Sequence, residues 1–382
     1  MKRNLLTFFL AAASLALFAG CSSNTTVELT TDTIAPIMND DSCGYIDENG
    51  NIVIDFQFKD CGSFSENGLA YASKDGKYGY IDTSGNFVIK EQFDYATDFS
   101  NGYAVVCEDS LYGIINEDGE YVIEPQYTGL RAFSSQGLAV ALEDTLYGYV
   151  NENGEEVIPP QYDDVDPFTE EGYALVSKDD LYGIIDTSGN YVIEMKYDYL
   201  EMFSSNSLAL AKQNGKYGFI DKSGNTIIDF KYDLAFSFTD CGLAAVAIDD
   251  EWGFIDESGN LAIDCQFDMV YAFSDYGLTI VKEDGLCGII NTNGEYVLKP
   301  TYAYIEAFAD NGLAAYVEDN KWGYLNSNGS VAIKATYDYC SSFGSKEIAL
   351  IQKDGLCGAI RSDGSYAVEP KYQNIGTFTS YK

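Results

Sequence analysis

The feature that most constrains this chain is a glycine that returns every 35 residues and follows an aromatic residue or a cysteine. One step is 34 residues, between Gly79 and Gly113, and the others are 35. Spacing this regular indicates a tandem array, in which each unit packs mainly on its neighbours. The ten glycines are Gly44, Gly79, Gly113, Gly148, Gly183, Gly218, Gly253, Gly288, Gly323 and Gly358.

One copy of the repeat contains three short apolar runs separated by turn signals. An Asp-Gly pair predicts a two-residue hairpin between the first two runs. A Thr-Ser-Gly turn separates the second run from the third, and its glycine suits a left-handed backbone. We therefore expect each unit to be a three-stranded antiparallel meander followed by a connector. The runs are Leu69–Ala72, Tyr78–Ile81 and Phe87–Ile89, and the turns contain Asp75-Gly76 and Gly85.

The strands are apolar on both faces. In the second run, Tyr78 and Tyr80 point to one side and Ile81 to the other. A sheet with one face in water would alternate polar and apolar residues, so these small sheets must be covered on both sides, most simply by one another. The expected fold is all-β: a tandem array of about ten three-stranded antiparallel meanders in an open superhelix or a propeller-like ring. Because closed propellers usually have about four to eight blades, we favour the superhelix or a ring of unusual size.

The array is uneven at its ends. The first motif, at Gly44, has no complete strand of the Gly-Leu-Ala type before it, whereas the last, at Gly358, is followed by a third strand and a connector. Nine complete meanders and one incomplete meander result. The stretch Thr26–Met38 could supply the missing first strand.

The N-terminus has the pattern of an export signal. Lys2 and Arg3 precede a mostly apolar run, Leu5–Ala19, which is short for a membrane span and typical of a signal peptide. Phe18-Ala19-Gly20-Cys21 resembles the lipobox of bacterial lipoproteins, although Phe18 stands where leucine is usual. The resemblance implies cleavage before Cys21 and attachment of lipid to it.

We therefore expect residues 1–20 to be a lipoprotein signal peptide, residues 21–42 a lipidated cysteine and tether, and residues 43–382 the repeat array. Several acyl chains on Cys21 would suffice for stable anchoring to the cell membrane or outer membrane, on the extracytoplasmic side. The alternative is an ordinary cleaved signal with an incidental cysteine.

The chain is strongly acidic, since 22 Lys and Arg against 60 Asp and Glu give a net charge of −38. Loss of Lys2 and Arg3 with the signal leaves 20 basic and 60 acidic residues, or −40. Such a surface repels phosphates, so we expect no nucleic-acid partner. The charge serves solubility, or it attracts cations or a basic partner.

The repeat resembles that of the WG-repeat family, also called KWG-repeat, over about residues 43–380. Only Lys321-Trp322-Gly323 spells the full motif, and Tyr or Cys fills most other copies. The Asp-x-x-Gly turn, the Tyr-Asp or Phe-Asp pair and the Phe-Ser and Gly-Leu-Ala segments support the match. The resemblance implies a β-rich array used for interaction, and it carries no catalytic residues.

Residues that could support catalysis or hold a cofactor are few. The chain has no histidine, which excludes Ser-His-Asp and Cys-His arrangements. The recurring Asp-x-x-Gly, as in Asp82 to Gly85, is typical of a structural turn; the alternative is a calcium loop, but it offers few of the six or so oxygens that the ion requires. We expect no enzyme activity, no metal, no cofactor and no catalytic residue, and the ligand-binding residues stay unassigned.

Two further features have open interpretations. Acidic pairs such as Glu108-Asp109 and Glu318-Asp319 recur at the first hairpin and should line one edge, either as a solvated surface or as a docking rim for a basic partner. Of nine cysteines, Cys21 is assigned to lipid. Cys43, Cys287 and Cys357 occupy the Trp position, and Cys61 and Cys340 share another; disulfides can form in an exported protein, but the sequence does not fix their pairing.

Three functions compete. The first is a surface-tethered repeat protein that binds a protein or an envelope or extracellular glycan without catalysis. The second is a structural spacer of the envelope without a specific ligand, and the third is a carboxylate-based glycoside hydrolase. Exposed aromatic residues repeating along one edge would favour the first, a uniformly polar exterior the second, and one cleft with converging carboxylates the third.

Overall fold

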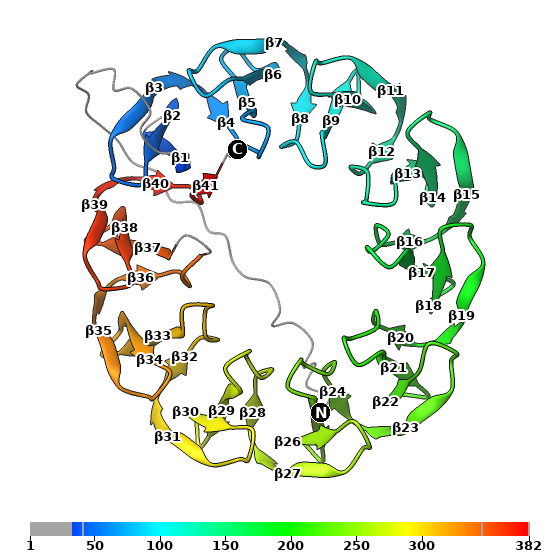
Figure 1. Ribbon diagram of the computed structural model, residues 1–382, viewed down its shortest axis with the longest axis vertical. Coiled ribbons are helices and arrows are strands. Elements are labelled where there is room, and N and C mark those ends of the chain that lie inside the picture. The colour runs from blue at the N-terminus through cyan, green and yellow to red at the C-terminus, as the bar shows by residue number, and fades with distance from the viewer. Residues whose placement is uncertain (1–32, 40–41, 345–346, 381–382) are drawn as a thin grey trace, which may run out of the picture.

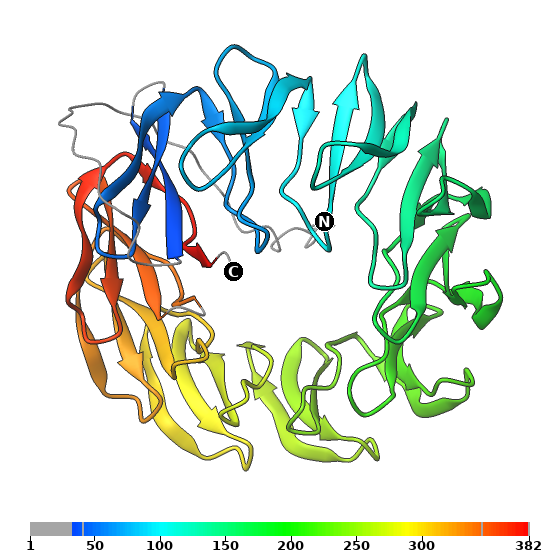
Figure 2. The same ribbon diagram turned by 45° about the horizontal axis from the view of Figure 1, so that its top comes forward.

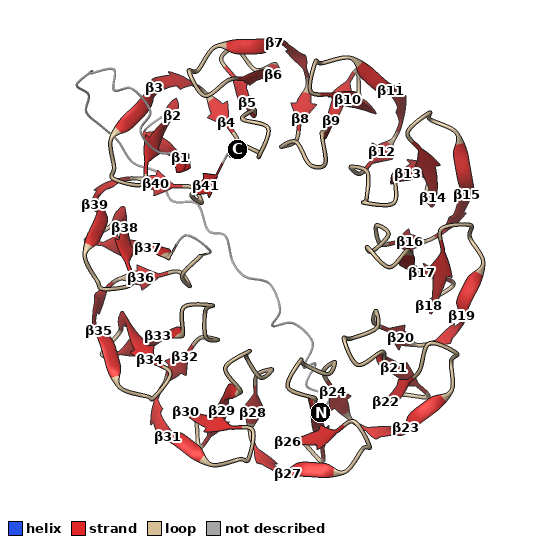
Figure 3. Cartoon of the chain, in the orientation of Figure 1, coloured by secondary structure: helices blue, strands red, loops and turns tan. Residues whose placement is uncertain are grey.

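A computed structural model describes residues 33–39, 42–344 and 347–380. Cys21 and the expected signal peptide, residues 1–20, lie outside the described residues. The described residues contain 41 strands and no helix, and therefore no helix that could span a membrane. The strands form ten antiparallel sheets, which we call blades 1 to 10, arranged in a ring (Figures 1 and 3). A tilted view shows the blades standing side by side around the centre (Figure 2).

Each blade has four strands in the same order (blade 1 also has a fifth, Thr379–Ser380), one more than the three apolar runs predict. The added strand is two residues long and comes from the connector, where so short a pairing leaves no periodic pattern in the sequence. It forms the edge of the sheet nearest the centre of the ring (Figure 1). These inner strands are β4 (Asp60–Cys61), β8 (Tyr95–Ala96), β12 (Gly129–Leu130), β16 (Asp164–Val165), β20 (Tyr199–Leu200), β24 (Leu234–Ala235), β28 (Met269–Val270), β32 (Tyr304–Ile305), β36 (Tyr339–Cys340) and β40 (Asn374–Ile375).

The three predicted runs form the rest of each blade, in chain order from the inner strand to the perimeter. The second strands are β1 (Thr33–Asn39), β5 (Ala70–Ser73), β9 (Tyr103–Glu108), β13 (Leu138–Glu143), β17 (Tyr173–Lys178), β21 (Ala209–Gln213), β25 (Leu243–Ile248), β29 (Leu278–Glu283), β33 (Leu313–Glu318) and β37 (Ile348–Lys353). The third strands are β2 (Ser42–Asp47), β6 (Tyr78–Ile81), β10 (Leu111–Asn116), β14 (Leu146–Asn151), β18 (Leu181–Asp186), β22 (Lys216–Ile220), β26 (Glu251–Asp256), β30 (Leu286–Asn291), β34 (Lys321–Asn326) and β38 (Leu356–Arg361). The outer strands are β3 (Ile52–Phe58), β7 (Phe87–Phe93), β11 (Tyr121–Tyr127), β15 (Glu156–Tyr162), β19 (Tyr191–Tyr197), β23 (Thr226–Tyr232), β27 (Leu261–Phe267), β31 (Tyr296–Tyr302), β35 (Val331–Tyr337) and β39 (Tyr366–Tyr372).

The motif glycine has a steric role on the third strand. In each blade a Cβ at this glycine would lie 2.8 Å or less from a carbonyl oxygen of the outer strand. The register of the outer strand shifts at this point, as between Tyr78 and Tyr80 of blade 2, so the extra residue of a β-bulge rests on the glycine. Only a residue without a side chain allows this approach, which explains why every copy of the repeat has glycine at this position.

The Asp-x-x-Gly segments are turns between the third and outer strands. Asp82 Oδ1 accepts hydrogen bonds from the backbone N–H groups of Ser84 and Asn86, both at 2.9 Å. Gly85 has a φ of 80°, the left-handed backbone expected from the sequence. The carboxylate thus supports its own turn. Among the described residues, no group of three or more His, Cys, Asp or Glu side chains could hold a metal ion.

Neighbouring blades cover each other's faces, as the apolar strands predict. An aromatic ring on the third strand of one blade packs against the phenylalanine of the next blade's Phe-Ser segment, with centroids 4.6 to 4.8 Å apart in six places, including Tyr149 with Phe168. Tyr149 Oη also donates a 2.7 Å hydrogen bond to the carbonyl of Asp166 in the following blade. The core is therefore a series of similar layers between blades.

The ring is closed by the two ends of the chain. β1 pairs with β2 on one side and with β40 on the other, and it also pairs with β41 (Thr379–Ser380). Blade 1 thus contains N-terminal and C-terminal strands, which lie together in Figure 1. Thr33–Asn39 supplies the missing strand of the incomplete first repeat, and the ring, rather than the open superhelix, is the architecture.

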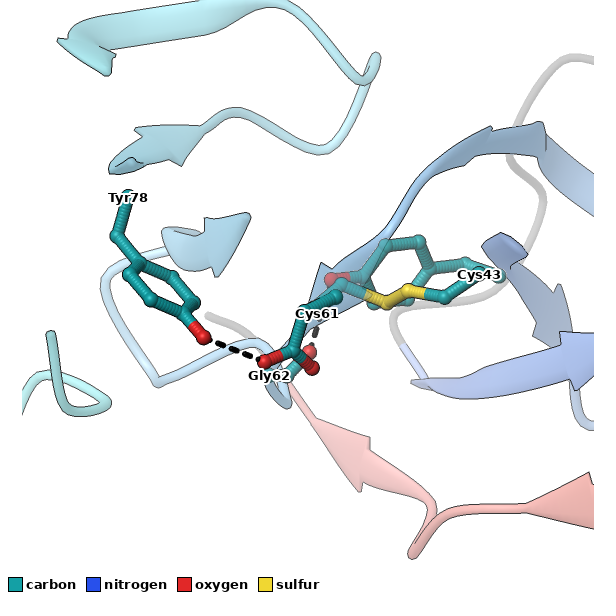
Figure 4. Close-up of a disulfide and its surroundings, with 6 residues drawn as sticks. Cys43, Cys61, Gly62 and Tyr78 are labelled. Carbon is teal, nitrogen blue, oxygen red and sulfur yellow. Dashed lines mark hydrogen bonds between the residues drawn. A yellow bond between two sulfur atoms is a disulfide. The ribbon is translucent and has the colours of Figure 1, made fainter. Parts of the chain in front are cut away.

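A disulfide joins Cys43 on β2 of blade 1 to Cys61 on β4 of blade 2 (Figure 4). The two Cα atoms are 6.3 Å apart, within the range that a disulfide spans. The same two repeat positions in blades 9 and 10 carry only one cysteine. Cys340 follows Trp322 by 18 residues, as Cys61 follows Cys43. Cys340 is a free, buried thiol.

Candidate binding surface

The ring has two faces that carry different turns. Because adjacent strands are antiparallel, the hairpins between second and third strands lie on one face, which we call the tip face. The Phe-Ser segments and Asp-x-x-Gly turns lie on the other, the loop face. The predicted acidic pairs therefore share the tip face, and Asp109, Asp144, Asp284 and Asp319, for example, are exposed there with a positive φ.

The first residue of each inner strand, which we call the inner position, is open to solvent in most blades, whereas the second residue is buried in nearly all of them. Four blades place tyrosine at the inner position, and Tyr95 and Tyr339 are each 48% exposed and Tyr304 38%. The complete set is Asp60, Tyr95, Gly129, Asp164, Tyr199, Leu234, Met269, Tyr304, Tyr339 and Asn374.

The tyrosines of the inner position contact the aromatic residue before the motif glycine and form two ladders across blades. In the first ladder, Tyr199 lies 6.0 Å from Tyr182 of the preceding blade and 6.1 Å from Tyr217 of its own blade, between ring centroids. Such contacts hold large, partly exposed rings in fixed positions, which favours binding by a preformed surface.

The second ladder lies three blades further along the ring. Trp322 lies between Tyr304 of its own sheet, at 5.5 Å, and Tyr339 of the next sheet, at 5.4 Å. Both contacts are edge-to-face. Trp322 is half-buried, so Tyr304 and Tyr339, on either side of it, carry most of the exposed aromatic surface of this ladder.

A carboxylate stands two residues after the inner position in three blades: Asp166, Glu201 and Glu306. Glu201 accepts a hydrogen bond from Tyr199 Oη at 2.6 Å and another from Ser237 Oγ. Glu306 accepts one from Ser342 Oγ at 3.2 Å. Burial raises the pKa of the Asp166 and Glu306 carboxyl groups, so each is costly to keep charged without a cation beside it.

In two blades a cation of the chain itself lies over the aromatic residue that precedes the motif glycine. The ammonium of Lys212 lies 4.9 Å from the ring centroid of Tyr217, in the first ladder. The guanidinium of Arg131 lies 5.9 Å from the centroid of Tyr147. Positive groups over aromatic faces at this distance are attracted by the ring electrons. This surface therefore accepts basic side chains in at least two positions.

One hollow adjoins the inner strands, and a second lies among the segments of the loop face. One, of about 300 Å³, is lined by Tyr95, Tyr112, Arg131 and Tyr147, and it lies where Gly129 leaves the inner position without a side chain. The other, of about 720 Å³, lies on the loop face between the segments around Phe64, Phe99 and Phe378. Both have mixed polar and apolar walls.

Aspartates of the Tyr-Asp pairs link neighbouring blades on the tip face. Asp94 accepts a hydrogen bond from Lys77 Nζ of blade 2 at 2.5 Å and one from the Asp109 N–H of blade 3 at 3.1 Å. The hydrogen bond from Lys77 lowers the pKa of Asp94. Lys216 pairs with Asp233, and Lys321 with Asp338, in the same way. The lysine of the full motif thus has a structural partner.

None of the residues of the two ladders was predicted as a site from the sequence. Their signal is weak, because the inner position varies from blade to blade and becomes visible only when the copies are aligned on the Tyr-Asp pair that precedes it. Cys21, the one site residue that was predicted from the sequence, lies outside the described residues.

Comparison with known proteins supports the fold and names the repeat. A crystal structure described as that of the eukaryotic initiation factor superposes with a TM-score of 0.53 at 10% identity, covering 91% of this chain and 97% of that one. Kluyveromyces lactis Hsv2 gives a TM-score of 0.38 at 11% identity, covering 66% and 98%. No curated protein matches the sequence.

The family model for the WG containing repeat matches nine successive segments: residues 44–78, 78–112, 112–144, 147–182, 182–217, 217–252, 252–287, 288–322 and 322–357. Together these matches extend over most of the ring, and all their boundaries but the one at residue 144 fall at or beside the motif glycine. The resemblance inferred from the sequence is therefore confirmed, and the chain belongs to the WG-repeat family.

Proposed function

We propose that this protein is a lipid-anchored, non-catalytic binding ring that holds a protein or glycan partner on the inner strands and tip face. The observation that carries the proposal is the set of tyrosines at four inner positions, three of them well exposed and each packed against the aromatic residue before a motif glycine. Exposed aromatic residues at repeating positions provide rigid contact area for a partner. A spacer without a ligand has no use for them.

The distribution of carboxylates also supports binding over hydrolysis. Burial raises the pKa of Asp98 to about 6, and it also raises the pKa of Asp166 and Glu306. These three groups belong to blades 3, 5 and 9 and do not converge on one cleft. A glycosidase needs two carboxyl groups within about 10 Å on either side of one bond.

The test is a binding assay with residues 22–382 against envelope fractions and a glycan array. Replacing Tyr304 and Tyr339 with alanine should weaken capture of the partner about tenfold or more, because exposed aromatic anchors dominate binding energies. The matched control replaces Tyr191 and Tyr296, which are 41% and 40% exposed on outer strands. Equal effects of the two double variants would contradict a binding role for the inner strands.

Anchoring through Cys21 is the second part of the proposal. The lipobox-like Phe18–Cys21 supports it, since acyl chains would be the membrane-seeking element of the exported chain. The Cys21→Ala protein should not incorporate a labelled lipid precursor in growing cells, and its processed form should leave the membrane fraction. Labelling of the variant would refute the assignment.

A further inference from the structure

The two aromatic ladders are built from equivalent positions, which allows a residue-by-residue comparison. Tyr304, Trp322, Glu306, Ser342 and Val317 each follow their counterparts in the first ladder by 105 residues, or three repeats. The counterparts are Tyr199, Tyr217, Glu201, Ser237 and Lys212.

The first ladder is complete within the chain. Lys212 places its ammonium over Tyr217, and both oxygens of the Glu201 carboxylate accept hydrogen bonds, one from Tyr199 and one from Ser237. The arrangement shows that this surface holds a basic side chain over an aromatic face, in a ladder that also contains a carboxylate.

The second ladder keeps the inner tyrosine and the carboxylate, has Trp322 in place of Tyr217 and Tyr339 in place of Leu234, and lacks the cation. Val317, half-buried, stands where the first ladder has Lys212. Among the described residues, no ion pair involves Glu306, and no cation lies over Tyr304, Trp322 or Tyr339. The described hydrogen bonds of Glu306 include the one from Ser342 but not the counterpart of the tyrosine bond in the first ladder.

The surroundings of the second ladder favour a positive charge. Burial first, and then the charge of Glu306, raises the pKa of Tyr304 to about 12, so the carboxylate acts on the ring from nearby. The exposed hairpin tip Glu318-Asp319 follows Val317, the pairing partner of Tyr304. A basic group at this ladder would therefore meet aromatic faces, one underpaired carboxylate and an acidic tip.

We propose that Tyr304, Trp322, Tyr339 and Glu306 form a recognition site for a lysine or arginine side chain of a partner protein. The proposal rests on the binding function proposed above and specifies its partner as a protein with an exposed basic segment. That side chain takes the place that Lys212 fills in the first ladder. The net charge of the chain, −38, draws such a segment toward the ring.

The two tryptophans of the chain make the site observable in the full-length protein. Trp322 lies in the second ladder, and Trp252, stacked on Phe236 two repeats earlier, serves as an internal reference. Labelling with 5-fluorotryptophan gives one ¹⁹F signal for each. Pentalysine, added at physiological salt, should shift the Trp322 signal saturably and leave the Trp252 signal in place, whereas pentalysine acetylated on its side chains should shift neither.

Three variants assign the effect. Glu306→Gln should weaken pentalysine binding about fivefold or more, whereas the control Glu194→Gln, exposed on the outer strand β19, should leave it unchanged. Val317→Lys should abolish binding, because the new lysine fills the site from within. If Val317→Lys disturbs folding, as checked by circular dichroism, the pair Glu306→Gln and Glu194→Gln still decides.

The outcomes separate this inference from the proposed function. An unmoved Trp322 signal, equal affinity of the two glutamine variants, or equal binding of the acetylated peptide overturns the basic-side-chain site. The basic-side-chain site is also overturned if a neutral oligosaccharide shifts the Trp322 signal and pentalysine does not. The proposed binding function is retained in that case. If envelope fractions, glycan array and pentalysine all fail to bind, the proposed function itself fails.

Discussion

The steric role of the motif glycine gives the sharpest prediction for stability. At Gly218 a Cβ would lie 2.6 Å from the carbonyl oxygen of Ile228 and 2.9 Å from the backbone nitrogen of Phe230. Both atoms belong to the backbone of β23, so no side-chain rotation relieves the contact. Forcing an extra carbon into a packed site costs about 3 kcal/mol at the upper end of the usual range.

A smaller effect opposes the clash. Alanine restricts the unfolded chain more than glycine does, which stabilises the folded state by about 0.7 kcal/mol where the backbone is compatible. Gly218 does not have a left-handed φ, so this gain applies. Gly218→Ala should therefore lower the free energy of unfolding by about 2 kcal/mol.

The measurement is urea unfolding followed by circular dichroism, with Gly344→Ala as the matched control. Gly344 also lacks a left-handed φ, but the nearest atom to its Cβ, the carbonyl oxygen of Ile348, is 3.8 Å away. The control should be neutral or slightly stabilising. If Gly218→Ala were as stable as Gly344→Ala, the close approach of the outer strand would not be the reason for the repeated glycine.

Three further outcomes are expected. Tyr149→Phe should cost about 1 kcal/mol of unfolding free energy, because it removes the hydrogen bond to the Asp166 carbonyl while keeping the ring; urea unfolding would show it, and no loss would refute the bond. Asp98 has its pKa raised by burial from 3.8 to about 6, so the folded state holds this proton more tightly than the unfolded state and stability falls as pH rises from about 4 to 6; in Asp98→Asn this part of the slope should vanish, and an unchanged profile would contradict it. Peptide mapping without reductant should link Cys43 to Cys61, and removing the bond through Cys61→Ser should cost about 3 kcal/mol; a map with both thiols free would refute the pairing.

Much of the fold could be predicted from the sequence because the repeat presents the same pattern ten times. The three apolar runs, the left-handed turn at Gly85 and the coverage of both faces of each sheet followed from local chemistry. The inner strands did not, because a two-residue pairing such as Tyr95–Ala96 has no period to detect. Closure of the ring depends on the angle between blades, which side-chain volumes set and residue patterns do not.

The site was less predictable than the fold. Repetition identifies residues that every blade needs, such as the motif glycine, and hides those that differ between blades. The site proposed at the second ladder depends on one such difference: Val317 occupies the repeat position that Lys212 occupies in the first ladder. Only the structure brings Tyr339 of one sheet against Trp322 of another and makes that difference meaningful.

The shared first blade sets the order in which the molecule can be completed. β1 is synthesised well before its inner partner, β40, and before β41. A chain shortened at its C-terminus therefore leaves one side of β1 unpaired, and an open strand edge is a template for association with other chains. Shorter rings consequently require the removal of whole internal repeats, whereas trimming from either end should yield aggregation-prone products that quality control can recognise.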